Sequence, residues 1–464
     1  MKPRFLKLVV LVIWHYLKRN VIWFGLGMII LGIIIIFQSR FNFFYSPNAL
    51  RIGLIGTFQE HDLPDEVTGL ISEGLVEADE TGMIKPVLIS GWEVNSDATE
   101  FKFKLKDNIK WADSSPVKSA DLEFAIPNVS VSYPDDKTIQ FKLKEAYSPF
   151  PSLLTKTLIK KSTSLGTGPY RIKSVEKSRI FITKITLEPI PSWNDKLPNI
   201  DVRFYPSEKI AQTGFDLGEV EVLGGVSNTK FDSNLIGTRQ KIDYSKIITI
   251  LYHANDSLVG GKNRSLRQAL SFITLPIRSE EIADNPYPKT SWAYDKSAKK
   301  YLGNKKEAES ALERAKTQMG DNQLKAEIIL TATPNLAEVG KKVVQGWKSL
   351  GFDAKLRVES GIPQNFQALL ITQSIPTDPD QYFLWHATQT KTNLSRFDSK
   401  RVDKDLEDGR KIINQDERQE KYFDFQKTLL EEAPATFLYF PKYNLVYLKK
   451  KEKQFNQILS LWKF

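Results

Sequence analysis

The 464-residue chain contains no cysteine and only four histidines. Without cysteine the chain cannot form disulfide bonds, thiolate nucleophiles, cysteine-ligated zinc sites or iron–sulfur clusters. No histidine lies at metal-binding spacing from another (His15, His61, His253, His386). Neither a G-x-S-x-G elbow nor a G-x-x-x-x-G-K-[ST] loop is present. The sequence therefore predicts no cofactor, no metal site and no enzymatic activity.

A strong charge of one sign is also lacking from most of the chain. The net charge is +10, but residues 1–45 carry six basic side chains and no acid, and the remainder holds 59 basic against 55 acidic residues. No basic stripe with interleaved aromatic residues is present, and such a stripe is what a strand-binding groove requires. Nucleic acid is therefore not expected as a partner.

Long hydrophobic runs are absent, with one exception near the N-terminus. Val21–Phe37 is uncharged and mostly apolar, and as a helix it would cover roughly 26 Å, near the lower limit for crossing a bilayer. Five basic residues precede it and only Arg40 follows closely, which favours a cytoplasmic N-terminus. We expect residues 1–45 to form a basic segment and a single-pass anchor in the cell membrane, with the soluble part extracytoplasmic. Alternatives are a cleaved signal peptide or a buried core helix.

The first half of the chain is rich in predicted strands. Phe101–Leu105 alternates apolar and polar residues, which is typical of a strand with one buried face. Before it we expect a short helix at Leu70, Ile71 and Leu75 and an acidic turn at Asp79–Gly82. Further strands are expected at Arg51–Phe58, Lys137–Lys144, Tyr170–Val175, Arg179–Leu187 and Asp201–Tyr205, followed by a helix at Ala211–Leu217 and a strand at Glu219–Leu223.

The second half alternates helices with strands. Ile247–His253 reads as a strand that crosses into a second lobe, and Leu324–Thr331, Ala337–Leu350 and Asp353–Val358 follow the order strand, helix, strand, which implies a parallel βαβ unit. Helices are also expected at Ser265–Ile273, Lys305–Lys316, Val402–Asn414 and Asp416–Glu432, a strand at Gln367–Thr372, and strands returning to the first lobe at Ala435–Tyr439 and Leu445–Leu448.

Several short motifs occur in one order along residues 50–445. They include an E-G-L-V-E run at Glu73–Glu77, G-T-G-P-Y at Gly166–Tyr170, R-S-L-R-Q-A-L at Arg264–Leu270 and T-D-P-D at Thr377–Asp380. Together they resemble the extracytoplasmic solute-binding proteins of family 5, the peptide, dipeptide and nickel binders that feed ABC importers. The resemblance implies an α/β, two-lobed periplasmic-binding-protein-like fold of type II, here preceded by the N-terminal transmembrane helix.

The same resemblance implies the domain organisation. Residues 46–245 plus 435–464 would form the first lobe, with a small subdomain at about 70–165, and residues 246–434 would form the second lobe. The segment from Phe124 to Thr167 is shorter than is usual in the family, so a reduced third subdomain is expected. Ser114 stands where the family usually has glycine. The absence of cysteine excludes the lipoprotein anchor that is common in this family.

A further departure concerns the ligand. In family members that take peptides, an aspartate three residues before the D-P-D loop pairs with the free amine of the ligand, and Ile375 occupies that position here. Asp378 or the loop Glu60–Asp62 could substitute for it. The predicted ligand-cleft residues are chosen by position, and for the aromatic ones core packing is an equally good interpretation: Phe58, Gln59, Glu60, Gln373, Asp378, Tyr382, Trp385 and Asn393.

The leading hypothesis is thus a membrane-anchored binding protein that captures a peptide-like or other small polar solute between its lobes. Its predicted partners are that solute, an ABC permease and the membrane through Val21–Phe37. A cell-surface receptor or scaffold that kept the fold without transport is the alternative. An extracytoplasmic hydrolase is a third hypothesis, but it requires a clustered nucleophile and base that the sequence does not provide.

Overall fold

The computed structural model describes residues 29–30, 32, 49–60, 62–161, 163, 165–191, 193, 196–227, 233–277, 280–459 and 461–462. The predicted span Val21–Phe37 lies outside these residues except for Ile29, Ile30 and Gly32, which are helical. Within the described residues, no helix is both long and apolar enough to cross a membrane.

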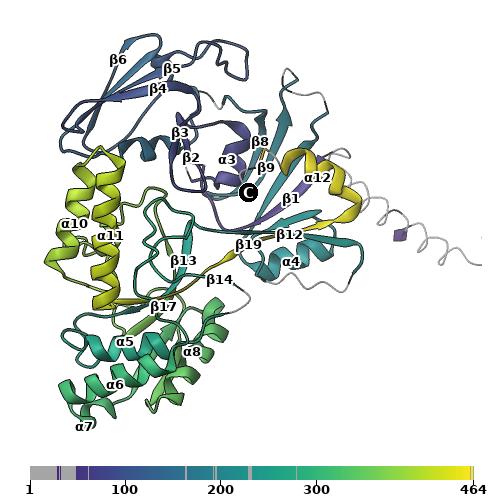
Figure 1. Cartoon of the computed structure of the whole chain (residues 1–464). Coiled ribbons are helices and arrows are strands. Elements are labelled where there is room, and N and C mark those ends of the chain that lie inside the picture. The colour runs from purple at the N-terminus through teal and green to yellow at the C-terminus, as the bar shows by residue number, and fades with distance from the viewer. Residues whose placement is uncertain are drawn as a thin grey trace, which may run out of the picture.

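A seven-stranded mixed sheet forms the first lobe (Figure 1). Strands β1, β10 and β11 are parallel to one another, and β9 and β19 flank them in antiparallel orientation. The run ALRIGLI of β1 is almost continuously buried, as expected for a strand covered on both faces. In sheet order the strands are β12 (Ile236–Ile242), β19 (Lys442–Leu448), β11 (Val222–Gly224), β1 (Ala49–Ile55), β10 (Asn199–Tyr205), β9 (Phe181–Pro189) and β8 (Tyr170–Ser178); the helices are α3 (Asp65–Ile71), α4 (Glu208–Asp216), η4 (Lys449–Lys451) and α12 (Glu452–Leu459).

A separate four-stranded antiparallel sheet carries its own hydrophobic core. In β5, Phe101, Phe103 and Leu105 are buried while Lys102 and Lys104 are exposed, so the predicted alternation is confirmed. Its strands are β4 (Ile89–Val94), β5 (Glu100–Leu105), β7 (Thr138–Leu143) and β6 (Val129–Asp135); beside them lie the hairpin β2 (Val76–Ala78) and β3 (Ile84–Pro86), η1 (Ser119–Asp121) and η2 (Phe150–Thr155). We call this unit the small body.

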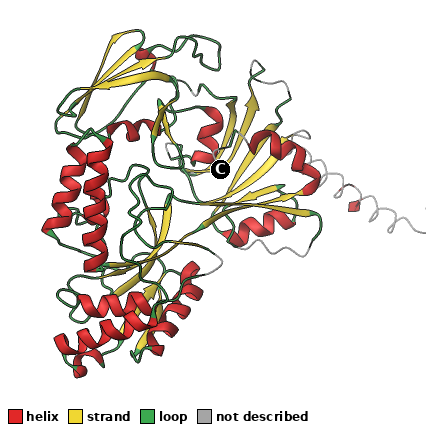
Figure 2. Cartoon of the chain, in the orientation of Figure 1, coloured by secondary structure: helices red, strands yellow, loops and turns green. Residues whose placement is uncertain are grey.

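The second lobe contains a six-stranded sheet with helices packed along it (Figure 2). The predicted βαβ unit is confirmed, because β15 and β16 pair in parallel and α8 connects them. In sheet order the strands are β14 (Glu281–Ile282), β18 (Ala435–Phe440), β13 (Lys246–Tyr252), β17 (Ala368–Ser374), β15 (Ile328–Ala332) and β16 (Ala354–Val358); the helices are α5 (Arg264–Ile273), α6 (Lys305–Met319), α7 (Asp321–Leu324), η3 (Pro334–Leu336), α8 (Ala337–Ser349), α9 (Tyr382–Trp385), α10 (Lys400–Lys411) and α11 (Gln415–Glu432).

The part of the chain that the structure describes passes between the two large sheets twice. It leaves the first sheet after β12 and enters the second at β13, and it returns between β18 and β19. The amide of Asp243 donates to the carbonyl of Pro441 at 2.8 Å, so the two crossings lie side by side. The strand predicted at Ala435–Tyr439 pairs with β13 in the second sheet, so its assignment to the first lobe is wrong. Leu445–Leu448, within β19, does return to the first sheet; the domain boundaries themselves stay a prediction.

Two local details correct or explain the sequence reading. The helix expected at Leu70, Ile71 and Leu75 is α3, which ends at Ile71, and the chain is extended from Ser72 onward. The G-T-G-P-Y motif packs against this end: the Gly168 amide donates to the Ile71 carbonyl at 2.8 Å, and a Cβ at Gly168 would meet that oxygen at the same distance. Ser114 has φ +66°, a conformation that glycine adopts most easily. This explains why glycine is usual at this position in the family that the sequence resembles.

Candidate functional site

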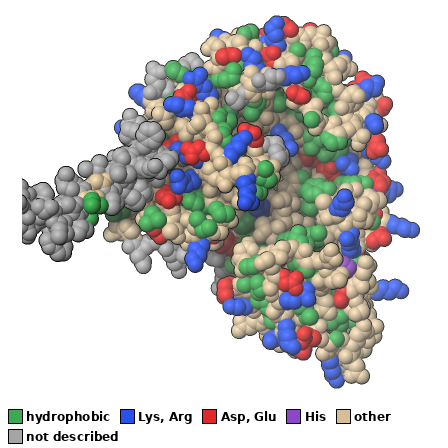
Figure 3. Space-filling model, turned by 180° about the vertical axis from the view of Figure 1, so that it is seen from behind, with side chains coloured by type: hydrophobic (Ala, Val, Ile, Leu, Met, Phe, Trp, Pro, Cys, Tyr) green, Lys and Arg blue, Asp and Glu red, His purple; other side chains and the backbone are tan. Residues whose placement is uncertain are grey.

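A cavity of about 590 Å³ lies where the two lobes meet, beside the crossing segments. Its lining comes from six places in the chain: the start of α3, the turn between β2 and β3, the crossing Lys241–Lys246, the loop Tyr287–Ser291, the loop Ile375–Pro379 and Tyr443 of β19. The molecular surface is hollowed between the lobes (Figure 3). Ligand sites in two-lobed proteins form at such junctions, where closure surrounds the ligand.

The turn at Asp79–Gly82 brings carboxylates to the cavity. Asp79 accepts hydrogen bonds from the Thr81 amide and hydroxyl at 2.8 and 2.6 Å and pairs with Lys85 at 2.9 Å, while Gly82 at φ +82° closes the turn. The hydrogen bond from Thr81, followed by that from Lys85, holds the pKa of Asp79 well below its usual range. The Asp79 carboxylate is therefore already bonded within the turn and is not the free carboxylate of the cavity.

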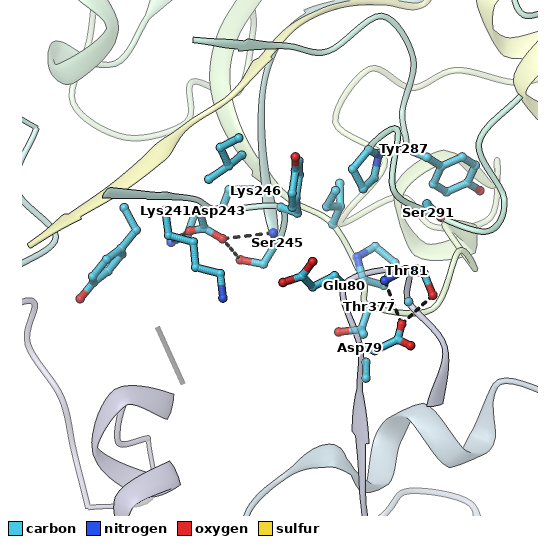
Figure 4. A pocket seen from close by; sticks show the side chains of 18 of the residues that line it. Asp79, Glu80, Thr81, Lys241, Asp243, Ser245, Lys246, Tyr287, Ser291 and Thr377 are labelled. Carbon is cyan, nitrogen blue, oxygen red and sulfur yellow. Dashed lines mark hydrogen bonds and ion pairs between the residues drawn. The ribbon is translucent and has the colours of Figure 1, made fainter. Parts of the chain in front are cut away.

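Glu80, the next residue, is exposed at the cavity and makes no hydrogen bond or ion pair within the described structure. Its side chain lies between the turn and Ser245 of the crossing (Figure 4). Its charge acts on Tyr244, whose pKa is raised by burial, then by Glu281 and then by Glu80. Asp65 at the start of α3 is a second exposed carboxylate of the lining.

The crossing contributes an internally paired set of polar side chains. Asp243 accepts from the Ser245 amide at 3.1 Å and pairs with Lys246 at 2.8 Å. Burial acts to raise the pKa of Asp243, but the hydrogen bonds and charge of Lys246 and the bonds from Ser245 outweigh it, and the pKa is lowered. Asp243 thus stays ionised and holds the crossing in shape.

The second lobe holds two buried aspartates, and each has an arginine partner. Asp378 pairs with Arg418 at 2.7 Å, and both side chains are less than a tenth exposed. Arg418 also donates to the Tyr422 hydroxyl at 2.9 Å. Asp380 pairs with Arg410 at 3.0 Å, yet burial outweighs this pair and raises the pKa of Asp380 to about 6. These carboxylates are occupied by the protein itself.

A second cavity of about 260 Å³ lies between the small body and the second lobe, and Gly82 borders both cavities. Here the small body touches the second lobe: the Trp292 amide donates to the Thr81 carbonyl at 3.0 Å, and the Ser148 amide donates to the Arg410 carbonyl at 2.7 Å. Its lining is largely apolar and includes Trp92, Phe101, Pro149, Trp292 and Ile413.

Three of the predicted ligand residues lie at the end of β1, away from both cavities. Phe58 packs on Phe204 with ring centroids 5.0 Å apart, Gln59 is half-buried, and Glu60 pairs with Lys177 at 2.8 Å. Glu60 and Asp378, which could substitute for the missing amine-binding aspartate, are thus each paired with a cation of the protein. Their role as substitutes stays a prediction.

The other predicted residues lie in the second lobe. Asp378 borders the smaller cavity, whereas Gln373, Tyr382, Trp385 and Asn393 border neither. Tyr382 stacks on His386 and receives the Arg410 guanidinium on its ring at 4.1 Å. The Asn393 amide donates to the Phe397 carbonyl at 2.8 Å within the core. The roles of these side chains in ligand binding stay predictions.

Sequence reasoning missed most of the lining that the structure assembles. Ile375, which the sequence marks only as a departure from the family, lines the larger cavity. The acidic turn at Asp79–Gly82 is predicted from the sequence as a turn, and its charge is the signal that could have indicated the site.

Within the described residues, no group of three histidine or acidic side chains could hold a metal ion. His253 packs edge-on against Phe366 and His386 contacts Glu407 at 3.0 Å; His15 and His61 lie outside the described residues.

Comparison with known families decides the class of this protein. A family model, "Bacterial extracellular solute-binding proteins, family 5 Middle", matches residues 124–394, more than half of the chain. The chain belongs to this family. This family 5 solute-binding protein is therefore an extracellular binding protein rather than an enzyme, and the resemblance inferred from its motifs is confirmed.

Similar proteins of the family are known from several bacteria. The "Probable D,D-dipeptide-binding periplasmic protein DdpA" of Escherichia coli is 23% identical over 437 residues, with 80% of this chain and 82% of DdpA covered. The "Oligopeptide-binding protein AppA" of Bacillus subtilis is 22% identical over 469 residues, with 83% of each chain covered.

Solved structures share the fold. CtaP from Listeria monocytogenes, an ABC transporter substrate-binding protein, superposes with a TM-score of 0.72 at 18% identity, covering 87% of this chain and 94% of CtaP. NikZ from Campylobacter jejuni, in complex with Ni(L-His), superposes with a TM-score of 0.69 at 21% identity, covering 87% and 95%. The two-lobed periplasmic-binding-protein fold is thus confirmed.

Proposed function

We propose that this family 5 protein captures a small polar solute carrying a positively charged group, such as a peptide with a free amine, and delivers it to an ABC importer. The observation that carries the proposal is the cavity of about 590 Å³ beside the crossings, with the unpaired carboxylate of Glu80 at its wall. Pockets for small ligands are commonly about 300–1,000 Å³. The names of DdpA and AppA, a dipeptide and an oligopeptide binder, support a peptide-like ligand.

In this mechanism the ligand amine occupies the space between Glu80 and the second-lobe loop at Ile375–Pro379. A charge-assisted hydrogen bond to Glu80, sheltered from water by closure, replaces the aspartate that the family usually places at Ile375. The ligand then contacts both lobes, so it stabilises the closed arrangement that a permease recognises. Asp378 and Asp380 act indirectly by holding the loop.

We also propose that the N-terminal segment anchors the protein in the membrane through Val21–Phe37, with the lobes outside the cell. The apolar run and the basic residues before it support this topology. Retention of the full-length chain in the membrane after carbonate extraction is the expected result. Release of an intact chain would contradict the anchor without touching the binding function.

Native mass spectrometry of the full chain, purified in mild detergent, tests the binding function. The expected result is a bound species of low mass that carries an amine or guanidinium group and is released on denaturation. Adding that species back should reduce the radius of gyration measured by X-ray scattering, because the lobes close. An empty cleft, together with no change in compactness in a peptide and metal-chelate library, would contradict solute capture and favour the receptor or scaffold alternative.

A further inference from the structure

The strands of the seven-stranded sheet have a second end, opposite the cavity. Ile52 of β1 lies beside Val222 of β11, which lies beside Tyr447 of β19. This register places Ala49, where β1 begins, at the same edge as Leu448, where β19 ends. The cavity lies at the other edge, where β1 leads toward α3 and β19 begins. We call the edge at Ala49 the entry edge, because the chain enters the two-lobed fold there.

Exposed apolar side chains lie along the entry edge. Leu235 is 74% exposed and Leu217 is 71% exposed, the two highest values among large hydrophobic side chains of the described residues. Trp193, in the loop between β9 and β10, is 53% exposed. These side chains come from three separate loops, so no single strained loop accounts for their exposure. Each of the three lies shortly before a strand that starts at the entry edge: Trp193 before β10, Leu217 before β11 and Leu235 before β12.

Lysines without side-chain partners accompany these apolar groups. Lys449, Lys450 and Lys453 are exposed, and no hydrogen bond or ion pair satisfies their ammonium groups within the described structure. The amide of Lys449 donates to the Leu235 carbonyl at 2.8 Å, which joins the basic segment to the most exposed leucine. Figure 1 shows α12, which contains Lys453, at this end of the sheet.

The neighbouring acids do not neutralise these lysines. Glu221 pairs with Arg51 at 3.0 Å and with Lys451 at 3.5 Å, and Glu452 lies 3.6 Å from Arg239. Asp216, at the end of α4, is an exposed acid for which the described structure shows no partner. A positive charge therefore remains at the entry edge beside the apolar side chains.

We propose that the entry edge is a membrane-binding surface that recognises anionic phospholipid. Lys449, Lys450 and Lys453 contact the headgroups, and the apolar side chains of Leu217, Leu235 and Trp193 enter the interface between headgroups and acyl chains. Clustered lysines with adjacent apolar and aromatic groups have the chemistry for this surface. The lipid is the occupant that both the charge and the exposed apolar groups fit.

The chain before β1 supports the same occupant. The predicted span ends at Phe37, and a connection from there to Ala49, even fully extended, reaches about 40 Å. The entry edge is the part of the described fold nearest to that connection along the chain. This argument rests on the proposed anchor, whereas the charge and exposure of the entry edge do not. Docking of this edge would direct the cavity away from the lipid surface.

Fluorescence quenching in reconstituted vesicles tests the proposal with the full chain. Because the protein has no cysteine, Leu235→Cys gives a single labelling position for an environment-sensitive fluorophore. Val358→Cys, at a position 47% exposed in β16 of the second lobe, gives the matched control. In vesicles containing phosphatidylglycerol and brominated lipid, we expect quenching at position 235 to exceed that at 358 several-fold. In phosphatidylcholine vesicles the difference should shrink.

Charge reversal separates this surface from the anchor. The combined variant Lys449→Glu, Lys450→Glu and Lys453→Glu should abolish the phosphatidylglycerol-dependent quenching at position 235 while the chain stays in the vesicle. Reversal of three exposed lysines of the second lobe, Lys306, Lys342 and Lys348, is the control and should leave quenching unchanged. Equal quenching at positions 235 and 358, equal quenching in both vesicle types, or insensitivity to the first reversal would each overturn the proposal. Circular dichroism of every variant verifies folding.

Discussion

Two sets of carboxylates differ in whether the protein already pairs them with a cation. Asp378 and Asp380 of the second lobe are buried and paired with Arg418 and Arg410. Glu80, on the turn between β2 and β3, is exposed and has no hydrogen bond or ion pair in the described structure. A buried carboxylate that is paired with an arginine is already held by the protein, whereas an unpaired carboxylate at a cavity is available to a ligand. The comparison therefore separates the two aspartates, which act within the fold, from Glu80, which can act in ligand binding.

The largest effect is expected from breaking the buried pair. Replacing Arg418 with methionine removes the cation and leaves Asp378 charged and buried, which typically costs about 3–5 kcal/mol of folding free energy. Urea unfolding measures the loss. Arg401→Met is the control, because Arg401 is 61% exposed and lies 3.7 Å from Asp424, where a pair contributes less than about 1 kcal/mol. Similar small losses in both variants would contradict the structural role assigned to Asp378.

An intermediate effect is expected from the protonation of Asp380. Its pKa is about 6 in the folded protein and 3.8 in the reference state, so the folded state holds a proton that the unfolded state releases between these values. The resulting stabilisation is fully present below pH 4 and decreases as the pH rises to about 6, by at most about 3 kcal/mol.

The difference in unfolding free energy between wild type and Asp380→Asn isolates this contribution. As the pH rises from 4 to 6, the unfolding free energy of the wild type should fall relative to that of Asp380→Asn. Asp97→Asn, on an exposed turn, is the control for the general effect of losing a carboxylate. If the difference in unfolding free energy between wild type and Asp380→Asn does not vary with pH in this range, burial does not raise the pKa of Asp380.

The smallest effect is expected at Glu80. It should change the free energy of ligand binding and leave the free energy of unfolding unchanged. Replacing Glu80 with glutamine keeps the shape and removes the charge, so affinity for an amine-bearing solute should fall about tenfold, or about 1.4 kcal/mol. Calorimetric titration with the recovered solute measures it, and the melting temperature of the ligand-free protein should not change. Glu60→Gln, at a residue paired with Lys177, is the control. Equal affinities for the Glu80 variant and wild type would remove Glu80 from the site.

The sequence predicted much of the fold because its signals are local. The alternation at Phe101–Leu105 and the strand–helix–strand order around Ala337–Leu350 each specify an element without reference to the rest of the chain. The sheet to which Ala435–Phe440 belongs could not be predicted, because every residue of this strand is buried and the pattern suits either sheet. Only its pairing with β13 decides the question.

The candidate site was less predictable because it is assembled over long distances in the sequence. Its lining extends from Pro64 to Tyr443, and no local pattern indicates which turns meet. The positions chosen from sequence favoured strand ends and aromatic residues, and Phe58 and Trp385 proved to pack in or against the core. Glu80 carried a charge in a turn, which is the commonest place for a solvated side chain and therefore a weak signal.

The adjacent crossings between the sheets restrict how the lobes can move. Because the described chain passes from one sheet to the other at two neighbouring segments, joined by the hydrogen bond from Asp243 to Pro441, twisting one lobe about the other would separate them. Bending about the line through both segments keeps them together. The opening of the cleft should therefore have a single soft degree of freedom, and one distance across the cleft would suffice to follow the whole transition.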